Sequence, residues 1–365
     1  MNMMEKDKKI RVGIIGASPA NFWATNVHLP ALSMLPQYEI TAVCTTKMET
    51  AKETARLFNV PYAFNDAEEM VNHPDVDLVV ITVTTFRHAE LVRLAIAAGK
   101  DVMCEWPLGI SLEESKELAQ EAENAGVRGV IGLQRRFDPG VQYFRDLIAA
   151  GYIGRLRSVK FRMEVDYYGG YYTSRSKQLA DKKKNHTLVN VVGGHFLDPI
   201  LSAVGEIRSL SGVVAQQFDH AEVIETKEII PVSVPDQVLI SGTLTNDAVF
   251  SAHIEGGKRN GSTSQTIVTG TKGDLLLSAD YTISGAQGDS NSLMPIEIPK
   301  SYLKVPQGDL QKEVYQTVLL YKALAEDLTK GTQVVPTFKD ACRMNFMLDS
   351  VIKASITGQR QVLES

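Results

Sequence analysis

One short stretch, Glu105-Trp106-Pro107, places a carboxylate and an aromatic ring at the end of an apolar run. The run Val102–Cys104 has the character of a buried strand, and Pro107 cannot continue a central strand because it lacks a backbone N–H. Glu105 and Trp106 are therefore expected at the carboxyl end of a strand. In an open parallel sheet this is the edge at which ligands bind, so the stretch is a candidate binding or catalytic site.

His195 is the residue best suited to act as a general base, because an imidazole titrates near neutral pH. Asp198 follows three residues later on the same face of an expected helix. The competing interpretation is a histidine whose hydrogen bonds are satisfied within the start of that helix, and both interpretations stay open. No role is assigned to the histidines in expected loops, strands or helix ends, namely His28, His73, His186, His220 and His253. No spacing of His, Asp or Glu residues predicts a metal site.

Alternating strands and helices are expected to position these residues in the first half of the chain. Apolar runs rich in β-branched residues predict strands at 9–16, 38–44, 62–64, 76–83, 101–105 and 127–133. Helical spacing predicts helices from residue 22 and over 49–58, 66–72, 88–98 and 112–125. This alternation predicts an α/β fold with a doubly wound parallel sheet.

The turn after the first strand is where such a sheet would bind a dinucleotide. The fingerprint G-x-G-x-x-G is reduced here to Gly16-Ala17-Ser18-Pro19-Ala20-Asn21, so only its first glycine is present. Ser18 and Asn21 tolerate turn geometry, and a helix beginning at Phe22 offers free N–H groups to a phosphate. The turn fits a cofactor site and a plain strand–turn–helix unit equally well.

The end of the second strand bears on the choice between NAD and NADP. An acidic residue at this position would bind the ribose hydroxyls of NAD, whereas this chain has Thr45, Thr46 and Lys47. Two hydroxyls and an ammonium group favour a 2′-phosphate, so NADP is expected in preference to NAD. The alternative is that these are ordinary loop residues.

The second half of the chain predicts few helices and many strands. Helices are expected at 141–149, 196–204, 312–328 and 338–355, and strands at 155–166, 209–214, 238–244, 248–254, 265–268 and 274–277. These strands suit a broad, mostly antiparallel sheet. The tyrosine-rich segment 167–172, which includes Tyr168, is expected either to stack on a sugar ring or to pack over the entrance of a cleft.

Length and composition limit the classes of protein that fit. A chain of 365 residues with 44% hydrophobic residues suggests two domains with ordinary cores. The formal charge of −5 gives no basic field for nucleic acid or an anionic membrane, and the lysine run 182–184 is expected to be a solvated loop. No stretch of about 18 apolar residues predicts a membrane span. Met1–Lys9 lacks the apolar core of a signal peptide, and no two of the three cysteines form a CxxC pair, so a cytoplasmic protein without a disulfide framework is expected.

Several motifs, in order along nearly the whole chain, resemble those of the glucose–fructose oxidoreductase / inositol dehydrogenase (Gfo/Idh/MocA) family. The segment 79–85 followed by His88-Ala89-Glu90 is similar to its I-x-T-P-x-x-x-H-A-E run, and 98–108 is similar to A-G-K-H-V-x-x-E-K-P-L. Further similarity lies at 134–139 (R-R-F-x-P), at Ile153-Gly154 (I-G), at 270–273 (G-T-x-G) and in the closing helix and tail at 354–362.

This resemblance implies an N-terminal Rossmann domain over residues 1–132 and a C-terminal α/β domain over 133–365. The second domain would have a large, mostly antiparallel sheet whose open face forms a homodimer or a dimer of dimers, and the last helices would pack back towards the first domain. NAD(P) would lie over the carboxyl ends of the first sheet, and a sugar or polyol would bind between the domains.

The resemblance also implies which residues contact each ligand. Those expected at the cofactor are Gly16, Ala17, Ser18, Asn21, Phe22, Thr45, Thr46, Lys47, Thr82, Val83, Thr84, His88, Glu105, Trp106 and Gln134. Those expected at the substrate are Glu105, Trp106, Arg136, Tyr168 and Asp198.

Oxidation of a sugar hydroxyl by NAD(P) needs a base that takes the hydroxyl proton as hydride leaves. In the family, the lysine of E-K-P and the aspartate and histidine of a D-x-x-x-H helix supply this chemistry. Here Trp106 occupies the lysine position and Val191 the aspartate position, whereas His195 matches the histidine. Neither an indole nor an isopropyl group can serve as an acid or base, so His195 is the expected catalytic base.

The missing groups point to one branch of the family, the galactose-pathway repressor-like proteins of yeasts. The likeness lies in 105–108, 18–21, 250–257 and 270–275. It implies an alternative to catalysis, in which the chain binds NAD(P) and a regulatory partner protein without turnover. The chain is shorter than that repressor, which argues against a repressor role. The primary expectation is an NAD(P)-dependent oxidoreductase with altered catalytic residues, in which cofactor ribose or water replaces the lysine.

Overall fold

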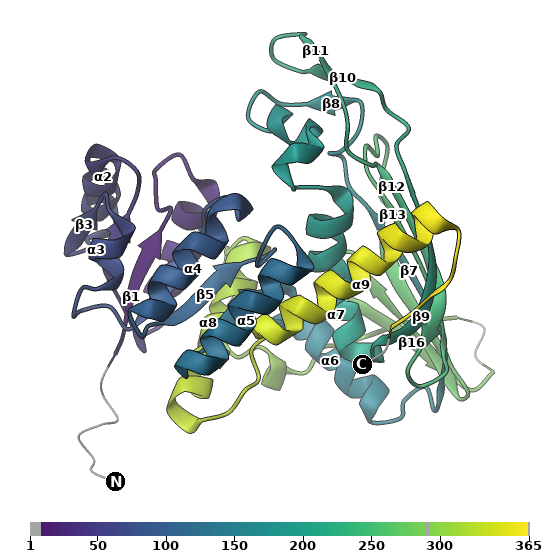
Figure 1. The fold of residues 1–365 in the computed structure, drawn as a ribbon. Helices are drawn as coiled ribbons and strands as arrows, with labels where there is room; N and C mark the ends of the chain where they lie inside the picture. The colour runs from purple at the N-terminus through teal and green to yellow at the C-terminus, as the bar shows by residue number, and fades with distance from the viewer. Residues whose placement is uncertain (1–8, 290–291, 364–365) are drawn as a thin grey trace. The chain divides into compact units, whose positions relative to one another are not determined.

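The structure is a computed structural model, and it describes residues 9–289 and 292–363 (Figure 1). The polar start Met1–Lys9, in which the sequence indicates no signal peptide, lies outside the described residues except for Lys9. Within the described ranges, no helix is long and apolar enough to cross a membrane.

The chain forms two compact units, which are named here unit 1 and unit 2. Unit 1 contains the residues up to Gln134 together with Val305–Arg343. Unit 2 contains Arg135–Lys304 together with the residues from Met344 onward. Each unit therefore combines a long continuous segment with a shorter segment from the last part of the chain.

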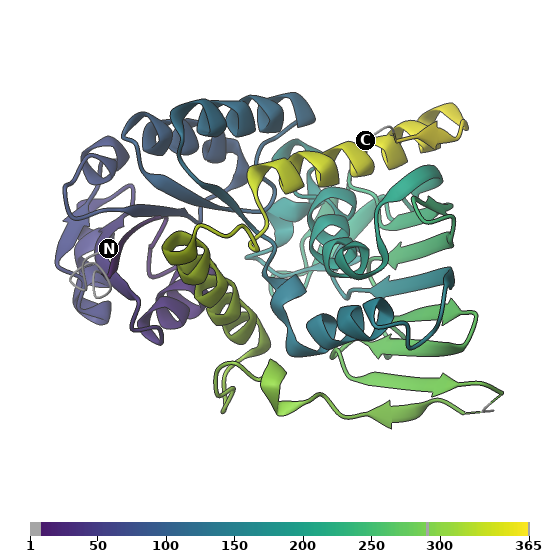
Figure 2. The same ribbon diagram turned by 90° about the horizontal axis from the view of Figure 1, so that it is seen from below.

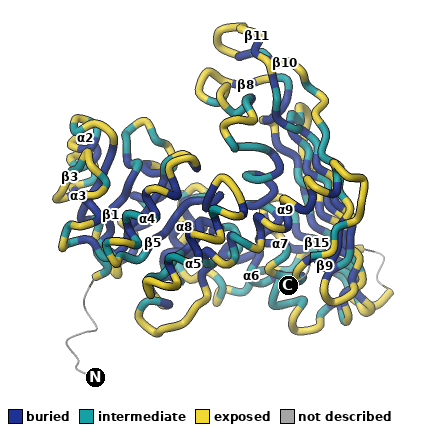
Figure 3. The backbone as a smooth tube through the Cα atoms, viewed as in Figure 1, coloured by how far each residue is buried: buried dark blue, intermediate teal, exposed yellow. Residues whose placement is uncertain are grey.

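A six-stranded parallel sheet forms the core of unit 1. Its order is β3-β2-β1-β4-β5-β6, and every neighbouring pair is parallel. The apolar residues of these strands are buried, as the dark blue course of β1 and β5 shows in Figure 3. The doubly wound sheet predicted from the sequence is confirmed, and its strand order reverses between β1 and β4. The strands are β1 (Ile10–Ile15), β2 (Tyr38–Cys44), β3 (Tyr62–Phe64), β4 (Leu78–Ile81), β5 (Asp101–Glu105) and β6 (Gly129–Gly132).

The helices of unit 1 follow the predicted pattern. The helix predicted from residue 22 begins there, passes through a π-helical turn (Ala24–His28) and continues as α1 (Leu29–Ser33). Pro30 lacks the backbone N–H that a regular α-helix would use at this point, which suits the wider turn just before it. The other helices of this unit are α2 (Met48–Phe58), α3 (Ala67–Val71), α4 (His88–Ala97), α5 (Leu112–Ala125) and α8 (Lys312–Lys330).

A nine-stranded sheet forms the core of unit 2. Its order is β17-β16-β15-β14-β7-β13-β12-β9-β18, and its pairs are antiparallel except β7–β13. This confirms the predicted large, mostly antiparallel sheet. The strands are β7 (Leu156–Glu164), β9 (Ile207–Ala215), β12 (Gln237–Leu244), β13 (Val249–Glu255), β14 (Gln265–Gly270), β15 (Gly273–Ser278), β16 (Ile283–Gln287), β17 (Met294–Ile296) and β18 (Gln361–Val362).

Helices α6 (Pro139–Ala149) and α7 (Gly193–Val204) lie along one face of this sheet, as Figure 2 shows. A π-helix (Leu188–Val192) leads directly into α7, so the helical segment begins earlier than the predicted residue 196. Helix α9 (Phe338–Thr357) crosses from the last segment of unit 1 into unit 2. Its Val351 packs against Gly212 of β9, where a Cβ atom would lie 2.9 Å from Val351 Cγ1.

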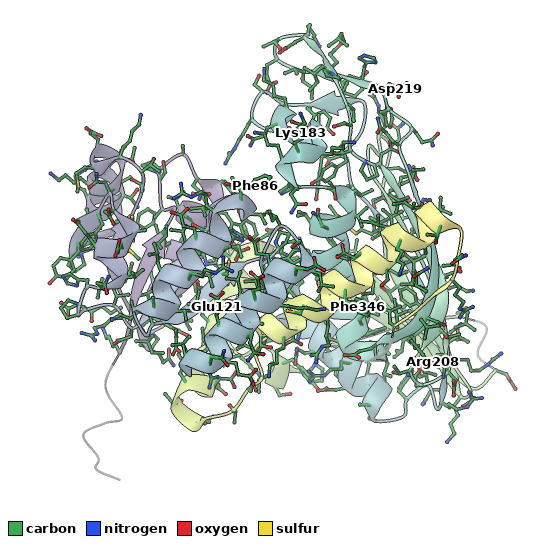
Figure 4. All side chains as sticks on the ribbon, in the orientation of Figure 1. Phe86, Glu121, Lys183, Arg208, Asp219 and Phe346 are labelled. Atoms are coloured by element: carbon green, nitrogen blue, oxygen red, sulfur yellow. The ribbon has the colours of Figure 1, made fainter. Side chains whose placement is uncertain are left out.

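A small three-stranded sheet, absent from the sequence prediction, also belongs to unit 2. It consists of β8 (Tyr171–Tyr172), β10 (His220–Val223) and β11 (Ile229–Pro231) in the order β11-β10-β8. The lysine run Lys182–Lys184 forms a short 3₁₀ helix with exposed side chains, of which Lys183 is labelled in Figure 4. Strands of two to four residues carry too little periodicity to be recognised in a sequence.

Gly16 in unit 1 leaves little room for a side chain, because a Cβ atom there would lie 2.8 Å from Val83 Cγ1 and 2.9 Å from Thr82 Oγ1. Its φ of +96° also lies in the region that favours glycine. We expect Gly16→Ala to lower the free energy of unfolding by about 2–4 kcal/mol, the sum of backbone strain and overpacking. Gly99→Ala is the matched control, since Gly99 has a φ of +66° but no atom within 4 Å of the added Cβ. It should cost only about 1 kcal/mol, and equal losses in urea unfolding of the two variants would contradict the contact argument.

Candidate functional site

The turn after β1 is closed by backbone hydrogen bonds and by the side chain of Asn21. The Gly16 N–H donates to Cys44 O at 2.9 Å, and the Ser18 N–H donates to Gly16 O at 2.8 Å. The Asn21 amide nitrogen donates to Gly16 O at 2.8 Å and to Thr82 O at 2.9 Å. Asn21 therefore joins the ends of β1 and β4, and its amide group is used within the protein.

The loop after β4 is tied to the loop after β5 by His88. Its Nδ1 lies 2.7 Å from Pro107 O and its Nε2 lies 3.0 Å from Val83 O, and the ring is 1% exposed. Burial lowers the pKa of His88, and the two carbonyl oxygens oppose this by favouring the protonated ring. Thr82 is also engaged, because its hydroxyl donates to Ile15 O at 2.9 Å. The side chains of His88 and Thr82 thus fix the loops at this edge of the sheet. Of the residues expected at the cofactor in this segment, Thr84 is the exposed one.

The end of β2 presents two exposed residues, Thr46 and Lys47. Thr45 is buried, and its hydroxyl donates to Lys47 O at 2.8 Å and lies 2.6 Å from the Thr50 hydroxyl. Of the three residues expected to meet a 2′-phosphate, only Thr46 and Lys47 expose their side chains. The Thr45 hydroxyl instead stabilises the turn before α2.

Glu105 ends β5, and its carboxylate belongs to a buried hydrogen-bonded chain. His28 Nε2 lies 3.0 Å from Glu105 Oε1, and His28 Nδ1 lies 2.7 Å from the Tyr321 hydroxyl of α8. The Tyr38 hydroxyl donates to Tyr321 O at 2.7 Å, which holds α8 beside β2. Burial keeps the pKa of Tyr321 well above its usual value, so the phenol stays protonated. No role was assigned to His28 from the sequence. In the structure, His28 fixes the position of Glu105 through their hydrogen bond.

Two buried polar atoms near the end of the unit 1 sheet have no hydrogen-bond partner among the described residues, Trp23 Nε1 and Gln134 Oε1. Gln134 is 3% exposed and follows β6, and Trp23 precedes the first π-helix. An unsatisfied buried polar atom in a native fold calls for a ligand, a water molecule or another explanation. A nicotinamide carboxamide carries both an N–H₂ donor and a C=O acceptor, so these residues fit a dinucleotide. Trp106, at the same edge, is 4% exposed.

In unit 2, Arg136 and Asp198 form a buried ion pair. Arg136 Nε donates to Asp198 Oδ2 at 2.9 Å, and Arg136 Nη2 donates to Asp198 Oδ1, which makes the contact bidentate. Asp198 is 4% exposed. Two residues expected at the substrate are thus bound to each other, and the pair joins the segment before α6 to helix α7.

His195 lies in the first turn of α7, and its Nδ1 is buried without a hydrogen-bond partner among the described residues. Burial, together with the charges of the nearby Arg135 and His186, lowers the pKa of His195 to about 3. The guanidinium of Arg135 lies 4.1 Å from the centre of the Phe196 ring. His195 is therefore neutral at physiological pH, and it is a weaker base than an ordinary imidazole.

The tyrosine-rich segment places Tyr168 inside unit 2. Tyr168 has a φ of +60° and is 1% exposed, and its hydroxyl is hydrogen-bonded to His186 Nδ1. Burial raises the pKa of Tyr168 and lowers that of His186. Tyr167 and Tyr171 are the exposed rings of the segment. The buried Tyr168 ring is covered by protein atoms, so stacking of this ring on a sugar stays a prediction that the fold does not favour.

The sequence alone missed His28, Tyr321 and His186 as members of these clusters. His28 and Tyr321 are 293 residues apart, and no local spacing connects them. His186 precedes His195 in a segment without regular periodicity. Among the described residues, no group of three or more His, Cys, Asp or Glu side chains could hold a metal ion.

Two family profiles match the chain, one in each half. Residues 10–133 match the Gfo/Idh/MocA oxidoreductase family, described as an NAD-binding Rossmann fold. Residues 139–279 match the C-terminal domain of Gal80p. The first match lies within unit 1 and the second within unit 2.

Relatives include dehydrogenases and a regulatory protein. The chain is 26% identical over 370 residues to dehydrogenase aclE of Aspergillus oryzae, covering 96% of this chain and 98% of the relative. It is 30% identical over 291 residues to the galactose/lactose metabolism regulatory protein GAL80 of Saccharomyces cerevisiae, covering 74% and 67%. A solved structure of a super-repressor mutant of Gal80p from the same yeast shares the fold, with a TM-score of 0.88, 24% identity and coverage of 97% and 98%. The chain belongs to the Gfo/Idh/MocA family, with an NAD-binding Rossmann fold followed by a Gal80-like C-terminal domain.

Proposed function

We propose that the protein is an NAD(P)-dependent oxidoreductase that acts on a hydroxyl group of a sugar- or polyol-like substrate. The observation that carries this proposal is His195, a half-buried imidazole that is neutral at physiological pH and whose Nδ1 has no hydrogen-bond partner among the described residues. A neutral imidazole can accept a hydrogen bond, and then a proton, from a substrate hydroxyl. The similarity to dehydrogenase aclE over nearly the whole chain supports the same class of reaction.

The residues of unit 1 would hold the cofactor, which supplies the hydride-transfer chemistry when bound. The turn 16–21 and the start of the following helix would bind the pyrophosphate. Gln134 Oε1 would accept a hydrogen bond from the nicotinamide carboxamide. In unit 2, the Arg136–Asp198 pair would position the segment before α6 beside α7, so that His195 keeps a fixed orientation.

NADP is the proposed cofactor in preference to NAD, because the end of β2 exposes Thr46 and Lys47 and carries no acidic residue. We expect Lys47→Ala to weaken NADPH binding about fivefold, the effect of losing one exposed charge contact. NADH binding should not change. Lys52→Ala, an exposed lysine of α2, is the control. Titration calorimetry measures the dissociation constants of NADPH and NADH for each variant. Tighter binding of NADH than of NADPH by the unaltered protein would contradict the preference for NADP.

The low pKa of His195 predicts a pH dependence of stability. Between its ordinary pKa of 6.5 and its folded pKa of about 3, the unfolded chain binds a proton that the folded chain does not. Stability should therefore fall as the pH drops through this window. Relative to the wild type, His195→Gln should reduce the loss of unfolding free energy between pH 6.5 and pH 5 by about 2 kcal/mol. Urea unfolding at both pH values measures this, with exposed His220→Gln as the control. If His195→Gln loses as much unfolding free energy between pH 6.5 and pH 5 as the wild type does, the pKa of His195 is not lowered in the folded protein.

A second candidate function is a dinucleotide-binding regulator that contacts a partner protein and does not turn over substrate. The observation that favours it is Trp106, a buried indole without acid–base capacity beside Glu105. The similarity to GAL80 supports this alternative.

Turnover distinguishes the two candidates. Purified protein with NADP⁺ and a panel of sugars and polyols should change the nicotinamide absorbance, and His195→Gln should lower the rate at least tenfold. His220→Gln should leave the rate unchanged. Absence of turnover with every substrate and both cofactors, in a protein that binds the dinucleotide, would favour the regulator instead.

We also propose a homodimer, or a dimer of dimers, formed through the open face of the nine-stranded sheet. Three apolar side chains on neighbouring strands of this sheet are exposed, Val213 of β9, Leu239 of β12 and Val249 of β13. Leu239 and Val213 face each other across the strand pair. An exposed apolar surface of this kind is typical of an interface between protein chains.

A further inference from the structure

The Glu105 carboxylate at the end of β5 is held by a series of hydrogen bonds through His28 to Tyr321. Tyr321 stays protonated, so its O–H can donate to His28 Nδ1 at 2.7 Å. The other ring nitrogen, Nε2, then carries the hydrogen and donates to Glu105 Oε1 at 3.0 Å. With this tautomer every donor in the series has an acceptor.

The position of the carboxylate is also fixed by packing. Gly132 of β6 lies against it, and a Cβ atom at Gly132 would lie 2.5 Å from Glu105 Oε1. The Tyr38 hydroxyl donates a hydrogen bond to Tyr321 O and so holds Tyr321, the residue at the other end of this hydrogen-bonded series. Glu105 therefore cannot turn away from the edge of the sheet without breaking buried hydrogen bonds.

No lysine or arginine among the described residues lies within 4.0 Å of the Glu105 carboxylate, and its partner within this distance is His28. The side chain is 11% exposed, at the carboxyl edge where β5 ends. A carboxylate at a binding edge with no lysine or arginine beside it attracts a positively charged ligand group.

The place of β5 in the sheet indicates which ligand group this is. In a doubly wound sheet the half that begins with β1 binds the adenosine part of a dinucleotide, which leaves the half formed by β4, β5 and β6 for the nicotinamide part. The nicotinamide ring is positively charged when oxidised and neutral when reduced. We propose that Glu105, positioned by His28, makes unit 1 discriminate between the redox states of its dinucleotide and favour the oxidised form. This inference rests on the part of the proposed function that gives unit 1 a dinucleotide site.

The test compares dissociation constants of the oxidised and reduced forms of the more tightly bound dinucleotide, measured by calorimetry on the full chain. Glu105→Gln keeps an oxygen that accepts from His28 Nε2 but removes the charge. It should shift the ratio of the two constants about tenfold toward the reduced form, the effect of losing one partly screened charge pair. A loss of structure alone would weaken both forms together and leave the ratio unchanged.

Two further variants separate positioning from charge. His28→Leu removes the N–H that holds the carboxylate and should shift the ratio in the same direction, whereas His28→Gln retains an N–H donor and should restore part of the discrimination. Glu121→Gln, on α5 (Figure 4), is the matched control for a lost carboxylate in unit 1 and should leave the ratio unchanged.

A ratio that stays the same in Glu105→Gln overturns the proposal. If the unaltered protein binds neither form, the dinucleotide site falls and this inference falls with it. If the ratio shifts as expected but no sugar or polyol is turned over, the inference stands and only the catalytic part of the proposed function fails.

Discussion

The carboxyl edge of the six-stranded sheet depends on one constraint, which is that buried polar groups there must find partners inside the protein. Asn21 meets this constraint by binding two backbone carbonyls, and His88 meets it by bridging the loops after β4 and β5. Glu105 meets it through His28. Trp23 Nε1 and Gln134 Oε1 do not meet it within the part of the chain that the structure describes.

The fold could be predicted from the sequence wherever a long segment carried one period. The runs at 101–105 and 112–125 were predicted with the bounds that the structure has, since an apolar run and a capped amphipathic helix are strong local signals. The helix from residue 22 was predicted, but its π-helical turn was not, because a local widening of a helix leaves the apolar spacing almost unchanged. The small sheet β8-β10-β11 could not be predicted, since strands this short are set by tertiary pairing.

The sequence could predict where the residues of the candidate site lie, but it could not predict what each side chain does there. Sequence position placed Glu105 and Asn21 at a binding edge, yet it could not show that the Asn21 amide is used by backbone carbonyls. His28, which is hydrogen-bonded to Glu105, lies 77 positions from it in the sequence. Tyr321, which is hydrogen-bonded to His28, lies 293 positions from His28. Contacts of this kind follow from the packing of α8 and the first π-helix, and no spacing in the sequence encodes them.

Two ionisable groups, Glu105 in unit 1 and His195 in unit 2, would affect the proposed reaction in the same direction. A base with a pKa of about 3 accepts a proton from a hydroxyl only weakly. A carboxylate that stabilises the oxidised dinucleotide also lowers the driving force for hydride transfer to it. The first effect slows the oxidation of an alcohol, and the second makes that oxidation less favourable. The charge arrangement is therefore compatible with slow catalysis and with sensing of the cofactor's redox state, and the indole of Trp106 adds no group that would reverse either effect.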